Sequence, residues 1–252
     1  RQMCIRDRIK PKDLVMLVVP IDLAAPKGRL ILPQVQVLRE VLDAGAMALT
    51  VKESEVTDML RGLAAKPALV ITDSQAVREV AAAVPEDIRL TTFSTLFARY
   101  KGDFAAQLAG VAAIDTLKDG DRVLIAEGCS HHVTCDDIGR VKIPNWMKKY
   151  TGRELKFEWT QGADFPDNLE DYALVVHCGG CMLNRAEVRR RINECARQGV
   201  KVTNYGIVIS KMQGVLERVV KGIAGAGATG SVSDTGSISD TGSISDTGEE
   251  GD

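Results

Sequence analysis

Residues 173–185 read Ala-Leu-Val-Val-His-Cys-Gly-Gly-Cys-Met-Leu-Asn-Arg, a short apolar run that leads directly into a Cys-x-x-Cys motif. A continuous apolar run of this length is typical of a strand buried on both faces of a parallel sheet. Beyond the motif, Asn184 and Glu187 have the spacing of a helix capping box, and Cys195 falls on the apolar face of the helix that follows. The stretch therefore predicts a strand that ends at the motif and a helix that begins just after it.

The same alternation of strand and helix extends over most of the chain. In the first series we expect strands at 14–19, 47–51, 68–71 and 88–92, each followed by a helix, the last of them continuous over 93–117. A polar turn at 118–121 separates a second series, with strands at 122–126, 154–159, 173–176 and 200–204. Such alternation implies parallel strands joined by crossover helices. We therefore expect an α/β fold of two consecutive domains with parallel sheets flanked by helices.

Composition excludes several functional classes. The chain has 252 residues, 45% of them hydrophobic and 26% charged, which is typical of a globular protein with a core. A net charge of -2 gives no indication of a nucleic-acid partner. The longest apolar run, Leu14–Ile21, is far shorter than the roughly 20 residues that a membrane-spanning helix needs. Six cysteines are too few for a disulfide scaffold, and no secretory signal is recognisable, so we expect a cytoplasmic protein.

The two ends of the sequence differ from the rest. Residues 1–9 fit no periodic pattern, and we expect them to be a foreign or truncated lead-in. Residues 223–252 contain hexapeptides such as TGSISD and several acids but no base, which predicts a disordered acidic tail. The GxGxxG match at 225–230 has no strand before it, so we interpret it as a linker rather than a nucleotide site. The chain as a whole resembles a fragment.

Cysteine and histidine cluster at two predicted strand ends. All three histidines of the chain lie within three residues of a cysteine, in the pattern Cys129-x-His131-His132 and, 45 residues further on, His177-Cys178-x-x-Cys181. Thiolate and imidazole are the side chains that bind soft or borderline metals. Because the carboxyl ends of parallel strands share one edge of a sheet, both groups are expected to meet there. The sequence therefore predicts a metal site.

The kind of site is less tightly specified by these residues. Gly179 and Gly180 allow close approach of the backbone and can offer amide hydrogens to sulfur. A closed zinc site, a 4Fe–4S cluster with one exchangeable position, and a redox pair formed by Cys178 and Cys181 all fit the pattern. A domain with its own sheet and core does not need a metal to fold, which favours a functional cluster. No phosphate-binding loop, radical-SAM motif or other catalytic site is recognisable, and Cys195 is expected in the core.

These motifs resemble the HydF family, the GTPase-type scaffolds of FeFe-hydrogenase maturation. The resemblance covers roughly residues 10–220 and is carried by segments 18–33, 127–132, 136–144, 177–185 and 203–206. It implies a dimerisation domain over residues 10–117 and an iron–sulfur cluster-binding domain over residues 118–222. An N-terminal GTPase domain, which belongs to the family pattern, is absent from the sequence given.

The resemblance also implies roles for individual residues. Cys129, Cys178 and Cys181 match the three cysteine ligands of a 4Fe–4S cluster, and His131 matches an exchangeable fourth ligand. His177, with Gly179 and Gly180, would support the cluster from nearby. The implied function is that of a scaffold and carrier, which holds a di-iron precursor beside the cluster and delivers it to the apo-hydrogenase.

Partners and assembly follow from the same resemblance. We expect a homodimer formed through residues 10–117, and contacts with FeFe-hydrogenase and with radical-SAM maturases. GTP binding would belong to the full-length protein, and we expect neither a nucleic-acid nor a membrane partner.

Overall fold

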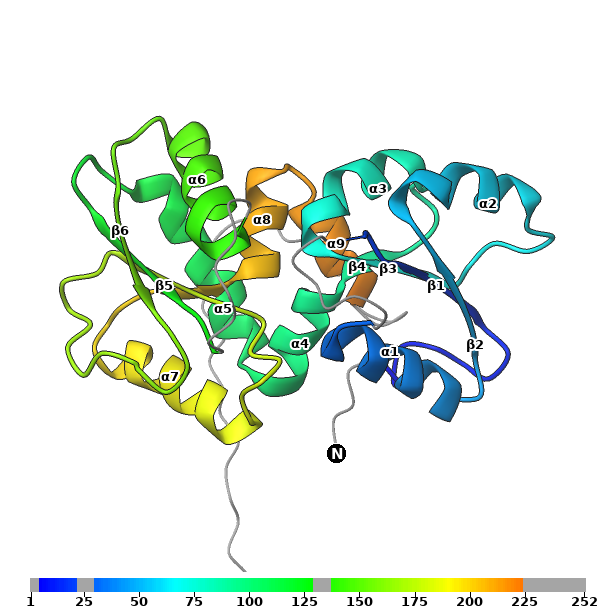
Figure 1. The fold of residues 1–252 in the computed structure, drawn as a ribbon, viewed down its shortest axis with the longest axis horizontal. Coiled ribbons are helices and arrows are strands. Elements are labelled where there is room, and N and C mark those ends of the chain that lie inside the picture. The colour runs from blue at the N-terminus through cyan, green and yellow to red at the C-terminus, as the bar shows by residue number, and fades with distance from the viewer. Residues whose placement is uncertain (1–4, 22–29, 129–136, 224–252) are drawn as a thin grey trace, which may run out of the picture.

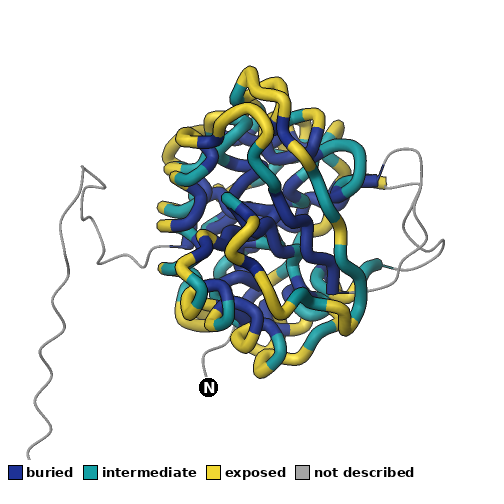
Figure 2. The backbone as a smooth tube through the Cα atoms, turned by 90° about the vertical axis from the view of Figure 1, so that its left-hand side faces the viewer, coloured by how far each residue is buried: buried dark blue, intermediate teal, exposed yellow. Residues whose placement is uncertain are grey.

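The computed structural model describes residues 5–21, 30–128 and 137–223, which form two four-stranded parallel sheets lying side by side (Figure 1). Helices cover both faces of each sheet, and buried backbone fills the interior while exposed positions gather on the outer loops and helices (Figure 2). The predicted α/β fold, with two consecutive parallel-sheet domains, is confirmed. Within the described residues, no helix is both long enough and apolar enough to cross a membrane.

The first sheet has the strand order β2-β1-β3-β4 and consists of β1 (Leu14–Val18), β2 (Met47–Val51), β3 (Leu69–Thr72) and β4 (Leu90–Thr92). Its helical elements are α1 (Leu32–Asp43), η1 (Glu53–Glu55), α2 (Val56–Gly62), η2 (Ser74–Ala76), α3 (Val77–Ala83) and α4 (Phe93–Lys101). Successive residues of β1 point to opposite faces: Val15 and Leu17 pack into the core cluster that includes α1 and α4, and Met16 and Val18 into the one that includes α3. This two-sided burial explains the uninterrupted apolar run in the sequence.

The second sheet has the strand order β6-β5-β7-β8 and consists of β5 (Arg122–Ala126), β6 (Lys156–Thr160), β7 (Leu174–His177) and β8 (Val202–Asn204). Its helical elements are α5 (Phe104–Gly110), η3 (Val111–Thr116), the π-helical turn η4 (Ile138–Lys142), α6 (Ile143–Thr151), α7 (Arg185–Arg197), α8 (Tyr205–Met212) and α9 (Leu216–Ile223). Asn184 caps α7, because its side chain accepts a hydrogen bond from the amide of Glu187, as the sequence predicts. Cys195 is fully buried on the inner face of α7, as expected.

Helices at the junction tie the two sheets together. α5 packs so closely on β8 that a Cβ atom added to Gly110 would lie 2.0 Å from the carbonyl oxygen of Val202. In the opposite direction, α9 returns from the second domain to cover β4, with Gly222 against the backbone of Leu90. Val77 and Ala98 of the first domain belong to the same core cluster as β5, β7 and α8. The two domains therefore share one interior rather than touching at their surfaces.

The structure differs from the sequence-based expectation at one helix. The prediction of a continuous helix over 93–117 is wrong, because α4 ends at Lys101 and α5 begins at Phe104. Gly102 leaves the helical conformation, and the Asp103 side chain caps α5 by accepting a hydrogen bond from the Ala106 amide. The break redirects the chain from the first sheet to the second.

The described part of the expected lead-in packs into the fold. Ile5 and Ile9 are buried in the core beside β1 and α1, and the Ile5 amide donates a hydrogen bond to the Glu40 carboxylate. Residues 5–9 are therefore part of the first domain, with two of their side chains in its core. The expected acidic tail and the GxGxxG match at 225–230 lie outside the described residues.

Candidate metal centre

The carboxyl ends of β5 and β7 lie side by side, and each strand leads into one half of the cysteine–histidine pattern. Ala126 pairs with His177 across these neighbouring strands, and the Cys178 amide donates to the Ala126 carbonyl over 2.9 Å. Two residues beyond Ala126, the Gly128 amide donates to Sγ of Cys178 over 3.1 Å. Because Gly128 immediately precedes Cys129 in the chain, the backbone that leads into the first half of the pattern touches a thiol of the second half.

The Cys178 sulfur accepts a second backbone hydrogen bond, from the Gly180 amide at 3.3 Å. Two amide donors on one sulfur are the arrangement that stabilises a thiolate ligand of a metal. With no metal bound, burial raises the pKa of the Cys178 thiol to about 11. A thiol in these surroundings loses its proton when a cation replaces it, which is the usual course of metal binding by cysteine.

Glycine is required at one position of the Cys-x-x-Cys loop and tolerated at the other. Gly180 has a φ of +62°, and a Cβ atom there would lie 2.9 Å from Cγ2 of Val188. At Gly179 the nearest heavy atom to an added Cβ would be Oγ of Ser94, 4.0 Å away. The left-handed turn at Gly180 is what aims its amide at the Cys178 sulfur.

His177 is buried and neutral at the end of β7. Its Nδ1 lies 2.7 Å from the Cys178 carbonyl oxygen, and since a carbonyl can only accept, Nδ1 carries the proton. Nε2 therefore bears the lone pair, and it is buried with no hydrogen-bond partner among the described residues. Burial lowers the pKa of the imidazole to about 4. The arrangement leaves an imidazole nitrogen poised to accept a hydrogen bond or a metal.

A lysine of the first domain binds the loop between β7 and α7, which contains the Cys-x-x-Cys motif. Nζ of Lys101, at the end of α4, donates to the carbonyl oxygens of Gly180, Cys181 and Leu183 over 2.9, 2.9 and 2.8 Å. Cys181 itself packs against the core of the first domain. Lys101 is not recognisable from the sequence, because its three partners lie about 80 positions away and no local pattern links them.

A buried carboxylate precedes the other half of the pattern. Glu127 is 1% exposed and lies beside Tyr205 and Gln161, whose polar atoms approach its oxygens to 3.4 Å, and beside Arg140 at 3.6 Å. Burial raises the pKa of the Tyr205 hydroxyl well above its ordinary value, so this group stays protonated and available as a donor. The neighbouring Asp137 caps η4, because its side chain accepts hydrogen bonds from the amides of Gly139 and Arg140. This network holds the side chain of Glu127, which stands two residues before Cys129 in the chain. No local pattern in the sequence indicates it.

The donor set suits a thiolate-bound metal. Cys178 and Cys181 are both unoxidised, partly buried thiols on one glycine-bounded turn, and soft sulfur ligands of this kind favour zinc and iron–sulfur clusters. Across the described residues, no group of three or more His, Cys, Asp or Glu side chains could hold a metal ion. The other predicted ligands, Cys129 and His131, and likewise His132, Cys135 and Asp136, lie outside the described residues.

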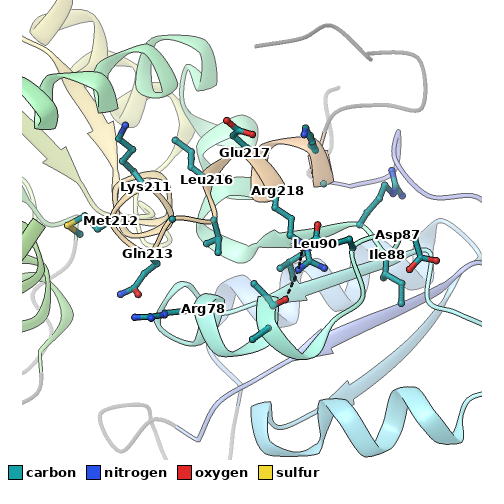
Figure 3. Close-up of a pocket in the computed structure, with 18 of the residues that line it drawn as sticks. Arg78, Asp87, Ile88, Leu90, Lys211, Met212, Gln213, Leu216, Glu217 and Arg218 are labelled. Atoms are coloured by element: carbon teal, nitrogen blue, oxygen red, sulfur yellow. Dashed lines mark hydrogen bonds and ion pairs between the residues drawn. The ribbon is translucent and has the colours of Figure 1, made fainter. Parts of the chain in front are cut away.

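A cavity of about 1010 Å³ lies elsewhere, between α3, β4 and the turn that joins α8 to α9 (Figure 3). Arg78, Lys211 and Arg218 line it, and Arg218 turns toward the first domain, where it donates to the carbonyls of Ala81, Val84 and Pro85. Neither Cys178 nor Cys181, the predicted ligands among the described residues, lines this cavity. It is therefore separate from the candidate centre.

The fold and the thiol pair define an α/β protein with its candidate ligand site at the carboxyl ends of parallel strands, where such proteins usually bind ligands. Two family models match the sequence: the Hydrogen maturase F dimerization domain over residues 4–102 and the Hydrogen maturase F tetramerization domain over residues 105–222. The chain therefore belongs to the hydrogen maturase F family, as the resemblance to HydF predicts. The two matches meet where α4 gives way to α5, whereas the sequence analysis expected the division at the turn 118–121.

Other comparisons add nothing to this assignment. No curated protein matches the chain. Among solved structures, a transcriptional regulator of the NtrC family from Clostridium acetobutylicum is 12% identical, with 82% of this chain and 97% of that chain covered. Its TM-score of 0.25 is too low to support any argument.

Proposed function

We propose that this chain is the scaffold part of a hydrogenase maturase, which binds a 4Fe–4S cluster and carries a di-iron precursor to the apo-hydrogenase. The observation that supports it most is the hydrogen bond from the Gly128 amide to Sγ of Cys178, because Gly128 is the residue that precedes Cys129 in the chain. Cys129, Cys178 and Cys181 would supply three thiolates. The cluster, when bound, supplies an iron with a free or weakly held coordination position.

The residues around the thiols have separate tasks in this proposal. The amides of Gly128 and Gly180 lower the negative charge on the Cys178 sulfur by hydrogen bonding. His177 keeps its Nε2 lone pair within the same buried region, as a supporting group. His131 would occupy the fourth position reversibly, since an imidazole leaves more readily than a fourth thiolate when the cargo arrives.

The di-iron unit is cargo in this account, and the chain does no bond chemistry on it. Regulation by GTP would require the GTPase domain that the family resemblance implies. The radical-SAM maturases would supply the cargo and the apo-hydrogenase would receive it. Exchange between such partners requires that the cargo be held by few, labile bonds, which an open iron position provides.

The first domain is the family's dimerization domain, and its open sheet edge is the surface that we assign to a second copy. Of the two edges of this sheet, β4 is covered by α9, whereas β2 has only β1 as a neighbour among the described strands. Val35 and Leu42 of α1, and Met47 of β2, expose their apolar side chains beside this edge. An unpaired strand with an apolar border pairs readily with its own copy across a two-fold axis.

Substitution of single cysteines tests the ligand assignment. Cys129→Ser, Cys178→Ser and Cys181→Ser should each abolish iron and sulfide uptake during anaerobic reconstitution, because each removes one of three thiolates. Cys195→Ala is the matched control: this thiol is fully buried on the inner face of α7, so its loss should leave the iron content unchanged. Full iron retention in Cys129→Ser would contradict the three-ligand assignment. Zinc in place of iron, or thiol–disulfide exchange that needs only Cys178 and Cys181, would replace the proposal by a structural or a redox function.

A further inference from the structure

Lys101 is a buried ammonium that donates three hydrogen bonds to one loop. It is 8% exposed, and its three N–H bonds match three carbonyl acceptors, those of Gly180, Cys181 and Leu183. Its charge also lies 5.2 Å from the centre of the Phe97 ring. Three carbonyl groups of the loop between β7 and α7 therefore bind the same ammonium group.

The contacts orient the peptide groups of this loop. The Gly180 carbonyl points to Lys101, while the Gly180 amide points to the Cys178 sulfur. The same residue thus has its carbonyl held by a cation and its N–H aimed at a thiol. Without the ammonium, one buried and two partly buried carbonyl groups would lose a strong donor, and the turn would no longer be held in this orientation.

The cation comes from the other domain. Lys101 is the last residue of α4, in the part of the chain that matches the dimerization domain, whereas the loop follows β7 of the second sheet. Burying an ammonium is costly unless it is fully paired, and an apolar side chain of similar length would fill the same space without this cost. A contact of this kind is expected where a charge serves a purpose beyond packing.

We propose that Lys101 is a positioning residue for the Cys178–Cys181 loop, through which the first domain stabilises the thiolates and the reduced form of the bound cluster. The inference rests on the proposed cluster function for its redox part. A positive charge beside the loop opposes the negative charge of the thiolates and of the added electron, and it slows the loss of iron by keeping the turn closed.

The chain offers a matched control for this inference. Arg218 is a second largely buried cation, with 14% of its side chain exposed, and it also binds three backbone carbonyls, those of Ala81, Val84 and Pro85. It joins the two domains as Lys101 does, but it lies by the separate cavity and touches no residue of the Cys-x-x-Cys loop (Figure 3). Arg218→Met therefore removes a similar interdomain cation without altering the loop.

The test compares Lys101→Met, Lys101→Arg and Arg218→Met in the full chain. In Lys101→Met we expect a more negative reduction potential of the cluster and a rate of iron loss to a chelator about 10- to 100-fold faster than in the parent. Lys101→Arg, which keeps the charge, should recover most of the shift in potential, and Arg218→Met should leave the potential unchanged. Equal shifts in Lys101→Met and Arg218→Met, or no shift in Lys101→Met, would overturn the inference.

A measurement without the cluster separates the two proposals. Hydrogen–deuterium exchange of the iron-free protein should show faster exchange of the amides of residues 178–184 in Lys101→Met, and unchanged exchange there in Arg218→Met. Unchanged exchange in Lys101→Met would overturn the positioning role, whether or not the protein binds iron. If the parent protein takes up no cluster but the exchange result is as expected, the proposed function fails and the positioning of the loop by Lys101 stands.

Discussion

The amide of Gly128 donates a hydrogen bond to Sγ of Cys178 over 3.1 Å, although 50 positions separate the two residues in the chain. The contact exists because β5 and β7 are parallel neighbours in register, so that both chains leave the sheet at the same edge. It brings the backbone next to Cys129 against the Cys-x-x-Cys loop. The sequence pattern alone predicts this proximity, and the sheet register supplies its cause.

The turn at Gly180 is expected to be intolerant of a side chain. Gly180→Ala forces an L-residue into a left-handed conformation, at a cost of about 1–2 kcal/mol, and drives its Cβ into Val188. Because the Gly180 amide would then leave the Cys178 sulfur, we expect a large loss of iron and sulfide after reconstitution. Gly179→Ala is the control, since its Cβ would meet nothing closer than Ser94 at 4.0 Å. Equal iron content in the two variants would show that the turn does not shape the site.

The ion pair between Glu187 and Arg191 predicts a specific acid sensitivity. Arg190 and the fully buried Arg191 both donate to Glu187 over 2.8 Å, and these hydrogen bonds lower the pKa of Glu187 from 4.5 to about 2. Its contribution to the free energy of unfolding is therefore complete above about pH 4.5 and is lost as the pH falls toward 2.

Urea unfolding of the iron-free protein checks this prediction. Glu187→Gln should lower the free energy of unfolding by about 1–3 kcal/mol at pH 7, because Arg191 loses a charged partner in a buried position. The difference from the parent protein should shrink as the pH is lowered from 4.5 toward 2. Glu79→Gln, at an exposed position of α3, is the control for loss of a carboxylate. A difference that is constant over this range of pH would contradict the assigned pKa.

The exposed apolar border of β2 predicts a variant that separates the dimer. Leu42 is 55% exposed on α1, and a charge there would be buried without a partner when two copies pair. We expect Leu42→Asp to raise the dissociation constant of the dimer at least about tenfold, or about 1.4 kcal/mol, measured by analytical ultracentrifugation. Thr57→Asp, at an exposed position of α2, should leave the constant unchanged. Unaltered association of Leu42→Asp would place the interface elsewhere.

Close packing of α5 on β8 predicts a strong effect of one added methyl group. Gly110→Ala would place its Cβ 2.0 Å from the carbonyl oxygen of Val202, a backbone atom that cannot move aside alone. We expect a loss of about 1–3 kcal/mol in the free energy of unfolding, the usual cost of overpacking. Gly62→Ala has no heavy atom within 4 Å of the new Cβ and should be neutral or slightly stabilising. A neutral Gly110→Ala would mean that α5 does not rest on the second sheet.

The sequence predicts those parts of the fold that depend on local patterns. The apolar run of β1 and the strand that ends at His177 are recognisable because both faces of each strand are buried, and Asn184 is recognisable as a cap by its spacing from Glu187. The break after Lys101 has local signals in Gly102 and in Asp103, the cap of α5, but apolar residues continue on both sides of it and favour one continuous helix.

The candidate site also contains some residues that the sequence indicates and others that only the folded structure reveals. Cys178, Cys181 and the glycines between them stand in one short segment, so their joint role is visible in the sequence. Lys101 and Glu127 act through partners from distant segments, and neither has a neighbour in the sequence that indicates its burial. Contacts of this kind depend on how the two sheets are placed, which local periodicity does not specify.

Whether the chain holds a 4Fe–4S cluster is best measured by anaerobic reconstitution with iron and sulfide, followed by metal analysis and EPR of the dithionite-reduced protein. We expect about four irons per chain and an S = 1/2 signal of a reduced cubane. A colourless protein that contains one zinc per chain and gives no EPR signal would contradict it.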